Sequence, residues 1–93
     1  MKMAAVLLLL VVGAAPVSYQ LTITNTMPHI ITVAFRDSAE HRLGDLDAGQ
    51  SHTYTITDPA SPHIQVLAHM PAMGSDDDRD VTLRADSAVV VAF

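Results

Sequence analysis

Apolar and polar residues alternate strictly in several short segments of this chain. Within residues 53–57, Tyr54 and Ile56 stand at alternate positions between three threonines. A period of two places successive side chains on opposite faces, so the segment predicts a half-buried β-strand with Tyr54 and Ile56 facing the core. Residues 47–50 precede it with the composition of a tight turn that includes a glycine. Together with residues 42–46, they predict a hairpin around which further strands pack.

The same pattern predicts six more strands, separated by Asn-, Pro- and Asp-rich segments. The seven predicted strands span residues 19–24, 31–36, 43–46, 53–57, 64–68, 81–83 and 88–93. The longest predicted loop is the acidic segment 70–79, and no segment has helical periodicity. Seven short strands at this spacing predict an all-β fold, a seven-stranded antiparallel β-sandwich of immunoglobulin-like architecture.

The last predicted strand differs from the others because residues 88–93 are apolar throughout. This composition predicts a central strand buried on both faces. The alternative is an exposed edge that pairs with another chain by strand addition. Because a bare apolar edge promotes aggregation, we expect this strand to be covered or paired.

The first residues have the composition of a helical secretory signal peptide. Lys2 is followed by an apolar run over residues 4–12 and by small residues. The run is shorter than the ~20 residues that span a bilayer, which disfavours the alternative of an uncleaved membrane anchor. We therefore assign residues 1–18 to a signal peptide and residues 19–93 to one β-sandwich domain, with cleavage at the small residues 12–14 or before Tyr19. The predicted location is the periplasm or the extracellular medium.

Cleavage of that segment removes Lys2, the only lysine, and leaves four arginines against ten acidic residues, a net charge of −6. Such an acidic chain repels nucleic acid and anionic lipid, so neither is an expected partner. The sequence has no cysteine. An exported domain of this size must therefore be stable without a disulfide, through its apolar core, a ligand or a partner.

Five features recur in an order that resembles a loose group of small exported bacterial β-sandwich domains. They are a first strand ending in Asn25, a valine-containing second strand over 31–35, the Arg-Leu-Gly-Asp-Leu-Asp-Ala-Gly segment 42–49, the alternating strand 53–57 and the hydrophobic strand 89–93. The resemblance covers nearly all of the chain after the predicted signal peptide. It implies a β-sandwich fold and export, and it implies no activity.

Histidine and methionine are the residues that could support unusual chemistry. If consecutive strands alternate in direction, the loops after the first, third and fifth strands share one pole of the sandwich. That pole holds four candidate metal ligands, His29, His52, His69 and Met70. Imidazole and thioether groups suit copper, and imidazole suits zinc. The alternative is that the histidines are solvated and the methionines fill gaps in the core.

Asp76, Asp78 and Asp80 stand at alternate positions, as the oxygen ligands of calcium loops do. The glycine and the glutamate that complete such a loop are missing, so a solvated acidic loop is the simpler interpretation. The sequence also lacks a Gly-x-Ser-x-Gly elbow, a cysteine nucleophile and a glycine-rich phosphate loop. We therefore predict a non-catalytic binding or structural module of the bacterial cell envelope, without a cofactor, whose partner is a protein or another copy. The alternative is a small periplasmic copper- or zinc-binding protein.

Overall fold

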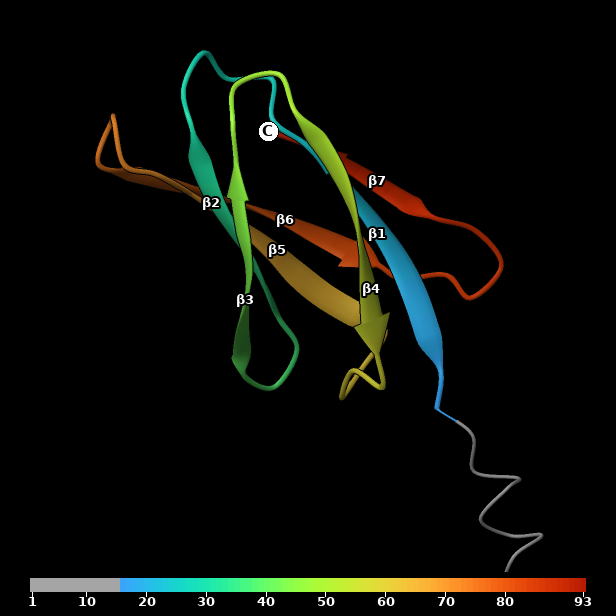
Figure 1. The fold of residues 1–93 in the computed structure, drawn as a ribbon. Coiled ribbons are helices and arrows are strands. Elements are labelled where there is room, and N and C mark those ends of the chain that lie inside the picture. Colours follow the sequence, from blue (N-terminus) through green and yellow to red (C-terminus); the bar gives the residue numbers. More distant parts are fainter. Residues whose placement is uncertain (1–15) are drawn as a thin grey trace, which may run out of the picture.

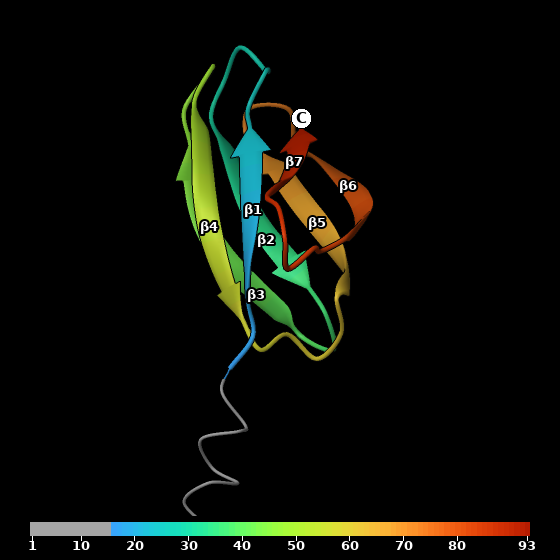
Figure 2. The same ribbon diagram turned by 90° about the vertical axis from the view of Figure 1, so that its right-hand side faces the viewer.

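The computed structural model describes residues 16–93, which form seven β-strands in two sheets packed face to face (Figures 1 and 2). The strands are β1 (Ser18–Thr24), β2 (Ile31–Arg36), β3 (Glu40–Leu46), β4 (Ser51–Thr57), β5 (His63–Met70), β6 (Ser75–Thr82) and β7 (Val89–Ala92). Nearly all of the predicted signal peptide lies outside the described residues. Within residues 16–93, no helix has the length and apolar character needed to cross a membrane.

One sheet has the strand order β4-β1-β7 and the other has the order β3-β2-β5-β6. The predicted all-β fold of seven strands in two layers is confirmed. The prediction of fully antiparallel pairing is wrong, because β7 runs parallel to β1 while the other neighbouring strands are antiparallel. The reason is geometric: strands that alternate in direction along the chain make odd-numbered strands run the same way. When β7 crosses over and joins the sheet beside β1, the pair is therefore parallel.

The core fills the space between the two sheets, and the predicted alternation determines which side chains enter it. Ile56 on β4 is 2 % exposed and Tyr54 packs against the core from the same face, as predicted. On β2 and β5 the inward-facing positions are Ile31, Val33, Phe35, Ile64, Val66 and Ala68, all of them buried. Each fully buried aliphatic side chain of this kind contributes about 1.5–3 kcal/mol to folding.

Asn25 is the one buried polar residue among those described, and it joins two loops at one end of the sandwich. Its Nδ2 donates to the carbonyl oxygens of His29 at 2.8 Å, Leu46 at 3.1 Å and Asp47 at 3.1 Å. Its Oδ1 accepts the backbone N–H of Met27 at 2.9 Å. The amide group thus satisfies backbone groups that the turns after β1 and β3 leave without strand partners.

The backbone of Asn25 completes the same junction. Its N–H donates to the Gln50 carbonyl at 2.8 Å, and its carbonyl accepts the Gly49 N–H at 2.9 Å. Gly49 has φ +77°, so the predicted glycine turn before β4 is confirmed. These contacts fix the β3–β4 turn against the end of β1.

Two strand predictions need correction. The segment 70–79, predicted to be the longest loop, is mostly strand, because β6 pairs with β5 from Ser75 to Thr82 and leaves only a turn at residues 71–74. The strand 88–93, predicted to be central and buried on both faces, is the edge strand β7, and its Val90 side chain is 67 % exposed. Both strands lie at sheet edges. There water solvates the charged side chains of β6 and reaches one face of β7.

Candidate functional site

The turns that follow β1, β3 and β5 lie toward the same end of the sandwich, with the β5–β6 turn projecting sideways (Figure 1). His52 on β4 packs edge-on against the Tyr54 ring, with centroids 4.6 Å apart. His69 on β5 places its Nδ1 2.5 Å from Asp76 Oδ1 across the β5–β6 pair. These two candidate metal ligands therefore engage neighbours on their own strand or on the adjacent one.

The other two candidates lie in different surroundings again. His29 follows β1, with its Nδ1 3.4 Å from the Ile30 carbonyl and its Nε2 without a hydrogen-bond partner. Met70 is 7 % exposed and belongs to the core. Among residues 16–93, no three His, Cys, Asp or Glu side chains form a group that could hold a metal ion. The structure thus places the four candidates at one end without assembling such a group from the histidines.

The three alternate aspartates do not form a calcium loop, because Asp76, Asp78 and Asp80 lie on the extended strand β6. Alternate residues of a strand are roughly 6.6 Å apart and share one face, so the carboxylates form a row. The row lies on the outer face of the four-stranded sheet, opposite the outward-facing residues of β5.

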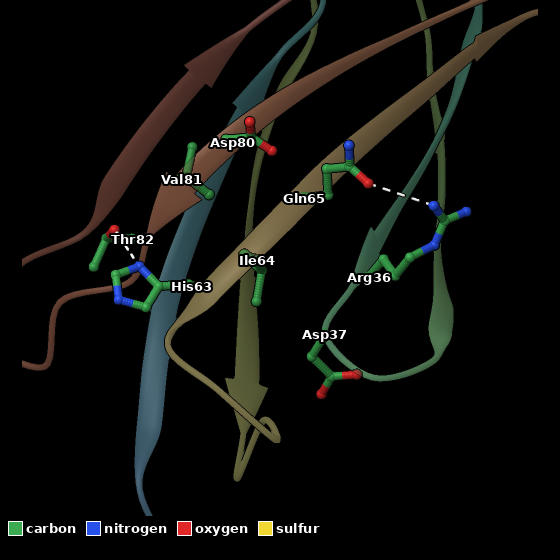
Figure 3. Close-up of a pocket in the computed structure, with 8 residues that line it drawn as sticks. All are labelled: Arg36, Asp37, His63, Ile64, Gln65, Asp80, Val81 and Thr82. Atoms are coloured by element: carbon green, nitrogen blue, oxygen red, sulfur yellow. Dashed lines mark hydrogen bonds between the residues drawn. The ribbon is translucent and has the colours of Figure 1, made fainter.

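A hollow of about 360 Å³ lies on this sheet where β2, β5 and β6 end or begin (Figure 3). Arg36 Nη1 donates to Gln65 Oε1 at 3.4 Å on one side, and His63 Nδ1 lies 2.9 Å from Thr82 Oγ1 on the other. These side chains are already paired, and all but the half-buried Gln65 are exposed. The hollow therefore lacks the water-excluded setting in which an acid or base is tuned for catalysis.

Asp37 borders that hollow, but its carboxylate has a structural role. It accepts the backbone N–H of Ala60 at 2.9 Å and those of Ser38 and Ala39, and it pairs with His41 at 3.0 Å. These contacts hold the pKa of Asp37 well below its usual value, and the hydrogen bond from the Ala60 N–H has the largest effect. The carboxylate ties the β2–β3 turn to the segment after β4.

A second hollow of about 350 Å³ crosses the same face over Ala34 and Leu67. Several charged residues at its walls are also paired. Arg36 contacts Glu40 at 2.9 Å, Arg42 contacts Asp45 at 3.1 Å, and these pairs are solvent-exposed. Exposed pairs of this kind contribute about 0–1 kcal/mol, so they shape the charge of the face more than its stability.

The outer face of the three-stranded sheet has a different composition. Four cross-strand pairs of polar side chains join β1 to β4: Ser18–Thr57, Gln20–Thr55, Thr22–Thr53 and Thr24–Ser51. The register continues onto β7, where Val90 lies opposite Thr22 and Ala92 opposite Thr24. We call these ten residues the neutral face, because none of them is ionisable in the physiological range.

The edge of the neutral face is β7. Phe93 donates its N–H to the Thr24 carbonyl at 2.9 Å and accepts the Thr26 N–H at 2.6 Å. In a parallel ladder only alternate residues bond to the neighbouring strand. By the same alternation, the backbone groups of Val91 bond to β1. The backbone N–H and C=O groups of Val90 and Ala92 therefore point toward the free edge.

The short length of β7, four residues, is its one protection against strand addition, because the strand carries no charge, proline or bulge. The other sheet ends in charged edges: β3 carries Glu40 and Arg42, and every residue from 76 to 80 on β6 is charged. Strand β4 has no Asp, Glu, Lys or Arg either, but it faces β3 across a hollow that Asp45 helps to line. Strand β7 likewise lies beside β6, whose Arg79 guanidinium is 4.9 Å from the centroid of the Phe93 ring. Among the described strands, β4 and β7 are thus the two uncharged edges, and β7 is the one that exposes a large apolar side chain, Val90.

Sequence reasoning considered an exposed β7 edge only as an alternative and did not identify the neutral face. The alternating threonines of residues 53–57 were the available signal, but their partners on β1 become visible only once β1 and β4 are known to be neighbours. Comparisons with protein-family models, with curated proteins and with solved structures found no match. The resemblance to small exported bacterial β-sandwich domains therefore stays a prediction.

Proposed function

We propose that this chain is an exported, non-catalytic β-sandwich module of the bacterial cell envelope that binds a protein partner along β7. The observation that supports this function best is the exposure of Val90, 67 %, on an uncharged edge strand. A strand added there gains backbone hydrogen bonds from Val90 and Ala92 and covers an apolar side chain. The seven strands in sheets of three and four are compatible with the immunoglobulin-like architecture that we include in this proposal.

Export through a cleaved signal peptide is the second part of the proposal, and the start of the fold bears on the cleavage position. The Val17 N–H donates to Asp58 Oδ1 at 2.8 Å, and the Asp58 N–H donates to the Val17 carbonyl at 2.8 Å. Ser18 then pairs with Thr57 at the beginning of β1. Cleavage before Tyr19 removes all of these contacts, so we propose cleavage upstream of Val17.

Two measurements test this function. Mass spectrometry of the chain recovered outside the cytoplasm gives its first residue, which we expect to precede Val17. Retention of the wild type in the envelope fraction is then compared with Val90→Pro, which removes the outward N–H while leaving the ladder to β1 intact. We expect the variant to be released. A full-length chain in the cytoplasm, or equal retention of the two proteins, contradicts the proposal.

Metal binding at the pole is separated from this function by titrating the mature chain with copper. The proposed function predicts no stoichiometric binding that depends on the histidines. A one-to-one heat signal that disappears in both His29→Ala and His69→Ala favours the metal-binding alternative instead.

A further inference from the structure

We infer that the strand that pairs with β7 is β7 of a second copy of this chain, an inference that rests on the proposed binding along this edge. After removal of the leader, each copy carries a net charge of −6. Two copies therefore repel each other unless they approach through surfaces without like charges.

The β6 edge cannot pair with its own copy without opposing aspartates, since four of the five residues from 76 to 80 are Asp. The β7 edge has no such conflict. Arg79, which lies over the Phe93 ring, is paired with Asp77 at 2.8 Å, and Arg84 in the segment before β7 is paired with Asp86 at 3.3 Å. Self-association of this acidic chain is thus less opposed at β7 than at β6, and β7 differs from the uncharged edge β4 in exposing Val90.

The geometry of β7 suits a two-fold arrangement. An antiparallel pair related by a two-fold axis presents the same surface from both copies and closes after two subunits. The outward N–H and C=O groups of Val90 and Ala92 in one copy then meet those of the other. The two three-stranded sheets become one continuous sheet, whose uncharged outer surface joins both neutral faces.

The side chains add to the pairing. Val90 lies on the outer face at β7, so a second β7 places a valine or alanine of the partner beside it. Valine favours extended structure because its branched side chain packs well against cross-strand neighbours. β7 has only four residues, and stable dimers commonly bury about 1,200–2,000 Å², so we expect a weak dimer that forms as the concentration rises.

Sedimentation of the mature chain over a range of concentrations tests the inference. We expect the wild type to shift from monomer to dimer, and both Val90→Pro and Val90→Lys to stay monomeric with unchanged thermal stability. The lysine variant keeps the backbone N–H but brings one positive charge from each copy to the same short interface, so it tests the inference even if proline disturbs the fold. A matched control, Val90→Thr, keeps the branched shape and is expected to dimerise.

Cysteine cross-linking locates the interface, because the chain has no cysteine of its own. With a thiol oxidant, we expect a covalent dimer from Val90→Cys, or from its mixture with Ala92→Cys, depending on the register. Thr55→Cys, on the neutral face but on the far strand β4, should give none. Dimers that cross-link equally well through position 55 overturn the inference.

The outcomes also distinguish this inference from the proposed function. If the wild type is monomeric at every concentration but Val90→Pro is still released from the envelope, the second copy is wrong and the partner is a different protein. If the envelope retention of Val90→Pro equals that of the wild type, the proposed function itself is wrong.

Discussion

Asn25 is the one buried polar residue among residues 16–93, 0 % exposed, and its replacement with alanine removes the amide group. The change deletes two N–H donors and one carbonyl acceptor. Three backbone carbonyls, those of His29, Leu46 and Asp47, lose their side-chain donor, and the Met27 N–H loses its acceptor. The Leu46 contact is the fully buried one, while the other three lie where water can reach part of the contact.

The magnitude follows from those contacts. A buried carbonyl left without a donor costs about 1–3 kcal/mol, and each partly buried bond contributes on the order of 0.5–1 kcal/mol. The expected loss in the free energy of unfolding is therefore about 3 kcal/mol. For a domain of this size that corresponds to a fall in Tm on the order of 15 °C. Because small domains have total stabilities of roughly 5–15 kcal/mol, the loss is a large fraction.

Urea unfolding followed by far-ultraviolet circular dichroism measures the effect. Gln50→Ala is the matched control, because the exposed Gln50 side chain makes only one bond to the same turn, from the Asp47 N–H at 2.9 Å. We expect the control to lose less than about 1 kcal/mol. Asn25→Asp keeps the shape but turns the donor into an acceptor, so it should be no more stable than the alanine variant at neutral pH. Equal, small losses for Asn25→Ala and Gln50→Ala refute the reasoning.

Three further predictions concern the turn, the neutral face and the core. Because the pKa of Asp37 is lowered in the folded protein, the stability that its carboxylate contributes is complete above the unfolded pKa of about 3.9 and is lost as the pH falls below it. Asp37→Asn should therefore reduce the free energy of unfolding at pH 7 and make that free energy fall less steeply in acid. An equally steep fall in the variant argues against this role. Thr22 and Thr53, whose hydroxyls lie 2.7 Å apart, should show a coupling energy of about 0.2–1 kcal/mol in a double-mutant cycle with valine; strict additivity contradicts the pair. Ile56→Ala should cost about 2–5 kcal/mol in urea unfolding, and a loss below about 1 kcal/mol would place Ile56 outside the core.

The strands with one buried face were predictable because burial leaves a period of two in the sequence. Ile31, Val33 and Phe35 on β2 follow this pattern, and all three are buried. Strand β6 was predicted only at its end, from residue 81, since both faces of its earlier part carry charge and aspartate disfavours strands in isolation. Its strand structure comes from pairing with β5, which the local sequence does not encode.

The position of β7 and the composition of the neutral face are tertiary properties. An apolar run is equally compatible with a central strand and with an edge, and only the crossover from β6 to the side of β1 decides between them. The pairs between β1 and β4 join residues about 30 positions apart, such as Thr22 and Thr53. For the candidate metal ligands, the shared end of their loops was predictable from the alternation of strand direction. The contacts of each side chain were not, and these contacts keep the histidines from forming one group.

Residue-resolved amide hydrogen exchange of β7 tests the central claim, that this strand is an open edge prepared to pair with another. In dilute monomer we predict fast exchange at Val90 and Ala92 and slow exchange at Val91 and Phe93, whose N–H groups point to β1. On association, Val90 and Ala92 should become protected while the other two change little. If Val90 and Ala92 are already protected in the dilute monomer, or stay unprotected in an associated form, β7 is not the binding edge.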